Sequence, residues 1–230
     1  YSQQEPRLVV HYASLDQDTS VFDVKEAYED GDADFHTIVA KMADIPRSAA
    51  KTINLGLFYG MGKAKLQAEL GVSKDKAEEL FSIYHNRVPF VKSLTKSVSN
   101  RAQQRGQIRT LLGRLCRFHL WEPNTFGMHK ALPFEQAVQE HGPGIKRAYT
   151  YKALNKLIQG SAADMTKKSM LDLYKEGIVA HIQIHDELDV SVESPEQAKK
   201  IVEIMENAVK LEIPNKVDYE SGKNWGTIND

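Results

Sequence analysis

The chain has 230 residues, of which 41% are hydrophobic and 27% charged, and its formal net charge is −1. These values are typical of a globular protein, and they do not decide for or against nucleic-acid binding, because acidic surface elsewhere can balance a basic groove. The single cysteine, Cys116, excludes an intramolecular disulfide and favours a reducing compartment. No stretch has the pattern of a signal peptide or of a membrane span, so we expect a cytoplasmic location and no membrane partner.

The first half of the chain predicts mainly helices. Residues 7–13 are mostly apolar and fit either the end of a strand or the start of a helix. In chain order, the helices expected after them cover residues 23–43 (with a turn at 29–32), 47–59, 74–86 and 90–105. Ser73 is a predicted N-cap, and Gly106 is predicted to stop the last of these helices.

The second half predicts strands among helices. In chain order, the expected elements are a basic hairpin at 108–118, an irregular stretch at 121–144 with one helix near 134–140, a helix at 145–176, a hairpin at 178–193, a helix at 195–211 and a last strand at 216–219. Because these elements interleave without a regular βαβ rhythm, the sequence favours the α+β class.

The hairpin near the end of the chain has charge at its tip. Apolar and polar residues alternate from Ile182 to Val190, and Asp186 and Glu187 stand where a tight turn would expose them. Adjacent carboxylates on a rigid hairpin can hold divalent metal ions beside a phosphate. A merely solvated acidic turn has the same pattern, so this segment alone leaves both interpretations open.

The helix expected at 47–59 carries a second pattern. Residues four apart share one face of a helix, so Arg47, Lys51, Leu55 and Tyr59 line up as two cations, an apolar residue and an aromatic ring. Such a face can hold a polyphosphate and pack on a base. The alternative is an exposed basic stripe beside an aromatic residue of the core.

Several motifs together resemble the family A DNA polymerases, the DNA polymerase I family. The pattern Arg-x3-Lys-x7-Tyr-Gly from Arg47 resembles motif B, His185-Asp186-Glu187 resembles motif C, and the stretch from Tyr1 to Arg7 resembles motif A after its aspartate. The further matches, in the order that the family has them, are Asp34-Phe35-His36, Thr110 to Arg114, Asn155 to Asp164 and Ser221 to Trp225. The stretch 121–149 resembles phage versions of the enzyme.

The resemblance implies a palm whose antiparallel sheet carries the catalytic hairpin, together with helical fingers. The expected division is palm at 1–33, fingers at 34–105 with the motif B helix at 45–60, and palm again at 106–230 with the motif C hairpin at 178–193. The thumb and the 3′–5′ exonuclease domain of such enzymes are expected to be absent from this chain.

The resemblance also implies template-directed DNA synthesis, in which deoxynucleoside triphosphates are added to a primer 3′ end with two Mg²⁺ ions. It makes Asp186, Glu187 and Lys51 catalytic, and it makes Asp186 and the Tyr1 main-chain carbonyl metal ligands. The implied nucleotide-binding residues are Gln3, Glu5, His36, Arg47, Lys51, Leu55 and Tyr59, with Glu5 excluding a ribose 2′ hydroxyl. Primer-template DNA would be contacted by Arg7, Arg109, Arg114, Asn155, Gln159 and His185.

Two departures from the family pattern bear on these roles. The motif A aspartate would stand just before Tyr1, so we expect an upstream polypeptide that carries it together with the thumb, as in a split or processed phage replicative polymerase of the host cytoplasm. Leu55 stands where the family usually has Phe or Tyr. The alternatives are a non-catalytic DNA-binding subunit of a replication complex and a metal-dependent phosphohydrolase built on the acidic hairpin.

Overall fold

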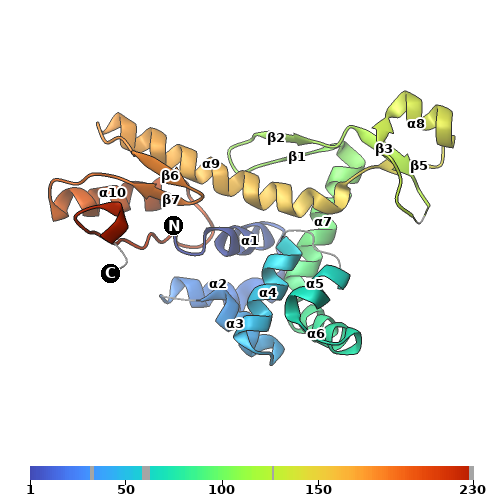
Figure 1. The fold of residues 1–230 in the computed structure, drawn as a ribbon, viewed down its shortest axis with the longest axis horizontal. Coiled ribbons are helices and arrows are strands. Elements are labelled where there is room, and N and C mark those ends of the chain that lie inside the picture. Colours follow the sequence, from blue (N-terminus) through green and yellow to red (C-terminus); the bar gives the residue numbers. More distant parts are fainter. Residues whose placement is uncertain (32–33, 59–62, 126, 228–230) are drawn as a thin grey trace.

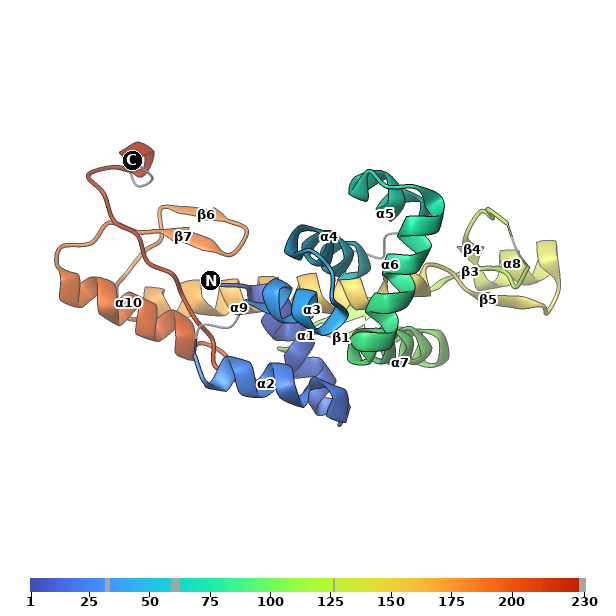
Figure 2. The same cartoon turned by 90° about the horizontal axis from the view of Figure 1, so that it is seen from below.

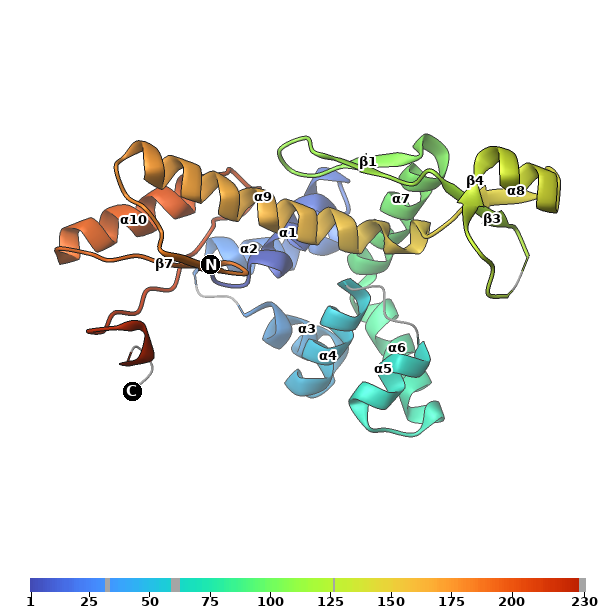
Figure 3. The same ribbon diagram turned by 45° about the horizontal axis from the view of Figure 1, so that its top comes forward.

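The computed structural model describes residues 1–31, 34–58, 63–125 and 127–227. Its long helix α9 (Ala153–Lys175) runs along the length of the molecule, and the other elements are arranged around it (Figure 1). A bundle of short helices lies along one side, a hairpin and helix α10 lie at one end, and a small sheet with helix α8 lies at the other end (Figures 1 and 3).

The first half of the chain is helical, as the sequence predicts. Its helices are α1 (Gln4–Leu15), the 3₁₀ turn η1 (Thr19–Val21), α2 (Phe22–Glu29), α3 (Phe35–Ala43), α4 (Arg47–Phe58), α5 (Lys63–Leu70), α6 (Lys74–Arg87) and α7 (Pro89–Arg105). The segment at 7–13 is therefore helix and not strand, and α5 is an element that the sequence pattern did not reveal. Ser73 caps α6 by accepting from the Lys76 N–H, and Gly106 ends α7 with φ 68°.

The second half of the chain contains three small antiparallel sheets. Strands β1 (Gln107–Arg109) and β2 (Leu115–Arg117) form the expected basic hairpin, and β6 (Ile182–Ile184) and β7 (Glu187–Asp189) form the acidic one. The third sheet joins β4 (Leu132–Pro133), β3 (Leu120–Pro123) and β5 (Ile145–Arg147) in that order. The remaining helical elements are α8 (Phe134–His141), η2 (Thr150–Lys152), α9, α10 (Pro195–Asn207) and η3 (Trp225–Thr227).

Three predictions in this half of the chain were wrong. Residues 145–147 form a strand because they pair with β3, so the long helix begins at Ala153 and not at residue 145. The stretch 121–144 is not mainly irregular, since it supplies two strands of that sheet and helix α8. Residues 216–219 have no strand assignment.

Two apolar clusters hold the elements together. The larger cluster joins α1, the bundle helices α3, α4 and α6, and the first part of α9, with Leu8, Phe35 and Ile53 fully buried in it. The smaller cluster joins the last turns of α9 to α10 through Leu173, Ile178, Ile201 and Met205. Tyr1 packs against both clusters, so the start of the chain, marked N in Figure 2, is tied to α9 and α10.

The coarse class is therefore α+β, as the sequence predicts. Over the described residues, no helix is both long enough and apolar enough to cross a membrane.

Candidate active site

A groove of about 730 Å³ lies between the start of α1, the middle of α9 and the β6–β7 hairpin. Its lining includes five residues that the sequence assigns to the site, and these are Gln3, Glu5, Gln159, His185 and Asp186. They come from three motifs that are far apart in the sequence. The fold therefore brings most of the predicted nucleotide, primer and metal contacts of motifs A and C to one place.

The turn of the hairpin sets the position of Asp186. Ile184 pairs with Glu187, which leaves His185 and Asp186 as a two-residue turn, and His185 adopts a left-handed backbone with φ 53°. The Gln183 side-chain amide donates to the His185 carbonyl at 2.6 Å. The Tyr1 amino group donates to the Asp186 carbonyl at 3.0 Å, so motif A and motif C meet at the turn.

The donor chemistry of this turn suits a hard cation. Mg²⁺ prefers carboxylate oxygen, main-chain carbonyl oxygen and water, and here a half-buried Asp186 stands beside an exposed Glu187 and the Tyr1 main chain. Over the described residues, however, no three His, Cys, Asp or Glu side chains gather closely enough to hold a metal ion by themselves. The described residues therefore fit a metal ion as some of its ligands, and further ligands would be needed to complete the set.

The exposed face of α4 carries the predicted cations. Arg47 and Lys51 are both exposed and Leu55 is half-buried, whereas Ala50 and Ile53 on the other side of α4 are fully buried. The helical register inferred from the sequence is thus confirmed as far as Phe58. Tyr59, the aromatic member of the pattern, and Gly60 lie outside the described residues.

Arg47 is held in place by an acidic N-cap. Its Nε donates to an Asp34 carboxylate oxygen at 2.6 Å and to the Thr37 hydroxyl at 3.1 Å. Asp34 also caps α3 by accepting from the His36 N–H. Although desolvation opposes the shift, these hydrogen bonds from Arg47 and Thr37 hold the pKa of Asp34 below its ordinary value.

His36 lies beneath this face and is only 8% exposed. Its Nδ1 is 3.0 Å from the Asn54 amide nitrogen, and Asn54 in turn accepts a hydrogen bond from the Tyr84 hydroxyl. Burial lowers the pKa of His36, and the nearby charges of Arg47 and Lys51 lower it further while Asp34 opposes them. His36 is therefore close enough to the two cations to be influenced by their charge, and its Nδ1 is already hydrogen-bonded to Asn54.

The side chains of two motif A residues, Gln3 and Arg7, form hydrogen bonds with other parts of the protein. The Gln3 side-chain oxygen accepts from the Phe35 N–H at 2.8 Å and from the Tyr28 hydroxyl at 3.1 Å, and this ties the edge of the groove to α3. Arg7 is only 3% exposed, donates to the Ser2 and Pro214 carbonyls and lies over the Tyr28 ring. The guanidinium predicted to contact DNA is therefore used inside the protein.

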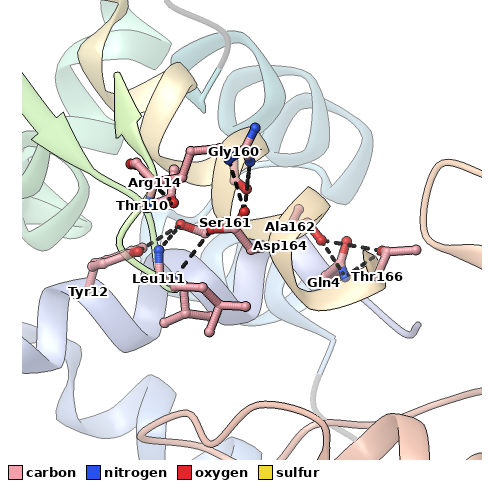
Figure 4. A network of polar contacts seen from close by, with 11 residues as sticks. Gln4, Tyr12, Thr110, Leu111, Arg114, Gly160, Ser161, Ala162, Asp164 and Thr166 are labelled. Atoms are coloured by element: carbon pink, nitrogen blue, oxygen red, sulfur yellow. Dashed lines mark hydrogen bonds and ion pairs between the residues drawn. The ribbon is translucent and has the colours of Figure 1, made fainter. Parts of the chain in front are cut away.

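The β1–β2 hairpin is fastened to α9 by a polar network (Figure 4). Arg114 donates to Asp164 at 3.0 Å and to the Gly160 carbonyl at 2.5 Å. The Ser161 hydroxyl accepts from the Leu111 N–H at 3.0 Å. Arg114 is half-exposed and bound to α9, whereas the exposed Arg109 donates to the Gly113 carbonyl of its own hairpin.

Gly160 allows this close docking. A Cβ built at Gly160 would lie 2.6 Å from the Thr110 methyl carbon, which is well inside van der Waals contact. On the same helix, Asn155 is half-buried and Gln159 is exposed, and their spacing of four places both on one face that leads to the groove.

Some residues that shape the site are not marked by any motif. Asn54 and Tyr84 are fully buried polar residues, and Gln4 donates from α1 to the Ala162 carbonyl and the Thr166 hydroxyl of α9 at 3.3 Å each. The only sequence signal for Asn54 is its place four residues before Phe58, on the apolar face of the helix.

Comparison with known proteins identifies the family of this chain. Residues 1–227 match the family model described as DNA polymerase family A. A DNA-directed DNA polymerase of Pseudomonas phage M6 is 34% identical over 98% of this chain and 37% of its own length. DNA polymerase I of Bacillus caldotenax is 31% identical over 98% of this chain and 25% of its own length.

A solved structure is similar over the whole chain. It is the POL domain of Pol1 from M. smegmatis in complex with DNA primer-template and dNTP, with a TM-score of 0.76 and 27% identity over 100% of this chain and 40% of that one. The chain therefore spans between a quarter and two fifths of the length of these proteins. With a family model that matches nearly every residue, the chain belongs to DNA polymerase family A.

Proposed function

We propose that this chain carries the nucleotide-binding and metal-binding parts of a DNA polymerase site that adds deoxynucleoside triphosphates to a primer 3′ end. The observation that carries the proposal is the groove, in which Gln3 and Glu5 of motif A face Gln159 of α9 and Asp186 of motif C. The similarity to a polymerase domain solved with primer-template and dNTP supports the same substrates.

In this proposal the exposed face of α4 holds the triphosphate. Arg47 and Lys51 present two cations one helical turn apart, which suits neighbouring phosphates. Lys51 would also donate a proton to the departing pyrophosphate. Leu55 would lie near the sugar, and Tyr59 would stack near the templating base.

The other residues position the sugar and the DNA. Glu5 in the groove would exclude a ribose 2′ hydroxyl, and Gln3 would support it from its bonds to α3. His185 at the hairpin turn would lie against the primer terminus, and Asn155 and Gln159 would contact the duplex from one face of α9. Arg109 and Arg114 would contact DNA from the β1–β2 hairpin.

Asp186, assisted by Glu187 and the Tyr1 main-chain carbonyl, would hold Mg²⁺ in this site. Two bound Mg²⁺ ions would lower the pKa of the primer hydroxyl and neutralise charge on the triphosphate.

We further propose that a polypeptide segment joined or bound at Tyr1 supplies the second carboxylate, together with a thumb. The Tyr1 nitrogen is 3.0 Å from the Asp186 carbonyl, so a residue placed there would lie beside motif C. Strand β6 is also exposed along its length, which leaves room for a further strand. Primer extension that appears only when such a segment is added would support this account, and full activity of the chain alone would contradict it.

The same geometry underlies a proposed division into palm and fingers. Residues 34–105 would form the fingers, and residues 1–33 and 106–230 would form the palm. In support, α3, α4, α5 and α6 lie together on one side of α9, and the groove residues lie on α1, α9 and the hairpin (Figure 1).

Primer extension by the assembled polymerase tests the function, with Asp186→Asn as the decisive variant. We expect at least about a thousandfold loss of rate, because the substitution removes a metal-binding carboxylate, and unchanged binding of primer-template. Glu187→Gln is the matched control and should lose less. A non-catalytic DNA-binding subunit would bind DNA without extending it, and a phosphohydrolase would release phosphate without a primer.

A further inference from the structure

A chain of buried polar groups crosses the helical bundle behind the α4 face. Tyr84 on α6 donates its hydroxyl proton to the Asn54 side-chain oxygen on α4, and the Asn54 amide nitrogen lies 3.0 Å from His36 Nδ1 on α3. Tyr84 and Asn54 are both 0% exposed. A buried polar group without a hydrogen-bond partner destabilises the folded protein, so each donor in this chain of groups must face an acceptor.

The hydroxyl of Tyr84 sets that direction. Burial raises its pKa, so the group keeps its proton and needs an acceptor. Asn54 Oδ1 is that acceptor. Turning the Asn54 amide around would place an NH₂ group against the phenol and leave a buried O–H proton without a partner.

With Asn54 so oriented, its NH₂ group faces His36. An amide NH₂ can only donate, so His36 Nδ1 must accept and cannot carry a proton. A neutral imidazole then has its single proton on Nε2. The ring is neutral near pH 7, because burial, Arg47 and Lys51 all lower its pKa against the opposing effect of Asp34.

The second ring nitrogen of His36, Nε2, makes no hydrogen bond within the described residues. The buried side-chain atoms without a partner in the described residues are His85 Nδ1, Arg147 Nε, Asp189 Oδ2 and Asn215 Oδ1, and His36 Nε2 is not among them. Arg47 lies at the same end of α3 as His36, because the Asp34 carboxylate that accepts from the His36 main-chain N–H also accepts from Arg47 Nε at 2.6 Å, and Lys51 follows one turn along α4. An N–H donor would therefore stand beside two positive charges, which is a suitable arrangement for an anionic oxygen.

We propose that Asn54 and Tyr84 are positioning residues that hold His36 as its Nε2–H tautomer, so that the ring offers an N–H donor to an oxygen of a triphosphate group beside Arg47 and Lys51. The identity of that ligand as a nucleotide rests on the proposed function. With the other tautomer, a nitrogen lone pair would face the phosphate oxygen and repel it. The buried pair thus decides whether His36 attracts or opposes the ligand.

Nitrogen NMR of the histidine rings tests the tautomer directly, without any enzymatic activity. In the purified ¹⁵N-histidine protein, with His36 assigned through His36→Gln, we expect a protonated Nε2 and a bare Nδ1. Asn54→Leu keeps the volume and removes the donor, so the two nitrogen resonances should move toward each other as the tautomers mix. A protonated Nδ1 in the unchanged protein would overturn the proposal, as would an unchanged His36 spectrum in Asn54→Leu.

Two further variants separate this role from a general loss of packing. Tyr84→Phe leaves Asn54 in place without its hydroxyl partner, so it should shift the His36 resonances less than Asn54→Leu does. Tyr12→Phe removes the hydroxyl of a half-buried tyrosine, which is bonded to Ser161 at 2.7 Å outside the bundle, and it should leave the His36 resonances unchanged. If Asn54→Leu does not fold, Tyr84→Phe and the spectrum of the unchanged protein still decide the question.

Inorganic triphosphate is the probe for the ligand. Its addition should shift the His36 Nε2–H resonance in the unchanged protein and should do so weakly in Asn54→Leu, whose affinity we expect to fall by about tenfold. In the active polymerase, Asn54→Leu should raise the nucleotide KM by about tenfold, with a smaller change in kcat. In a protein that already carries His36→Gln, the same substitution should raise the nucleotide KM by less than about twofold. Additive effects of the two substitutions would indicate a merely structural role for Asn54 and would refute the proposal.

Failure of the inference can be told apart from failure of the proposed function. A bare Nε2, or no response to triphosphate, would overturn the inference even in a protein that extends primers well. A protein that binds triphosphate through a protonated Nε2 but never extends a primer would contradict the polymerase function and leave the inference standing.

Discussion

The α3–α4–α6 bundle and the β6–β7 hairpin both present charged groups, but they are built in opposite ways. In the bundle, the exposed cations of α4 stand on a helix whose other face is fully buried, with Ile53 at 0% and Phe58 at 1% exposure. In the hairpin, strand β6 itself is exposed, with Ile182 at 43% and Ile184 at 37%, and Leu188 and Asp189 of β7 are only half-buried.

This difference shows where each region gets its rigidity. The bundle is held from inside, by its own core and by the buried pairing of Asn54 with Tyr84. A two-stranded hairpin has marginal stability by itself, so the turn that carries Asp186 depends on contacts from outside, chiefly from Tyr1. Core substitutions should therefore damage the bundle, whereas loss of anchors should damage the hairpin.

Phe58→Ala should have the largest effect on stability. Its ring is buried in the main cluster, and removing a buried aromatic side chain typically costs about 3–5 kcal/mol because a cavity is left. Urea unfolding should show this loss. Phe22→Ala is the control, because that ring is 55% exposed and its loss should cost less than about 1 kcal/mol. Equal losses would contradict the view that the bundle is held by its core.

Lys51→Met should separate the function of the α4 face from its stability. The side chain is exposed, so unfolding in urea should change by no more than about 0.5 kcal/mol. The nucleotide KM should rise by about 10- to 100-fold, because a charge-assisted hydrogen bond is lost. Lys41→Met is the matched control, because Lys41 is an exposed lysine on α3. An equal rise in the nucleotide KM in Lys41→Met would show that the lysines of this region act only through the overall positive potential of the surface.

Tyr1→Phe tests the external anchor of the hairpin. The Tyr1 hydroxyl lies 2.6 Å from both the Ser169 hydroxyl and the Met205 carbonyl, and its burial raises its pKa to about 12. Losing these bonds should cost about 1 kcal/mol and speed amide exchange in β6 and β7. Tyr151→Phe, with a ring that is 57% exposed, should change neither quantity. Unchanged exchange in Tyr1→Phe would mean that the hairpin is held in some other way.

Acid should weaken the bundle by a smaller amount. Burial is the main cause that lowers the pKa of both His36 and His85 below the ordinary 6.5. Below about pH 6.5 the unfolded chain therefore binds protons more readily than the folded one, and stability falls until the folded-state pKa is passed. Amide exchange corrected for intrinsic rates should show α3 and α6 losing protection between about pH 7.5 and 5.5. A combined His36→Gln and His85→Gln variant should lose less.

The parts that could be predicted from the sequence are those fixed by local pattern. The register of α4, the Ser73 cap and the existence of the acidic hairpin follow from neighbouring residues. The turn itself lies one residue earlier than predicted, at His185 and Asp186, because Glu187 pairs with Ile184. Strand β5 could not be predicted this way, because three residues form a strand only when a distant partner such as Trp121 pairs with them. Local periodicity instead extended the following helix across them.

The same limit applies to the candidate site. Five residues that line the groove were predicted by resemblance, but Asn54 and Tyr84 were missed because a buried polar residue and an exposed one look the same in a sequence. Arg7 shows the reverse case, since a charged residue predicted to face DNA is enclosed between two main-chain carbonyls and the Tyr28 ring. Burial arises from contacts far apart in the chain.

The missing side chain at Gly160 has a mechanical consequence. Because Thr110 sits within 2.6 Å of the place where a Cβ would be, the β1–β2 hairpin and α9 meet there without a spacer. Any side chain at residue 160 would push the hairpin away from the helix and would strain the hydrogen bond from Arg114 to Asp164. The hydrogen atom that Gly160 has in place of a side chain thus sets how closely the β1–β2 hairpin lies on α9.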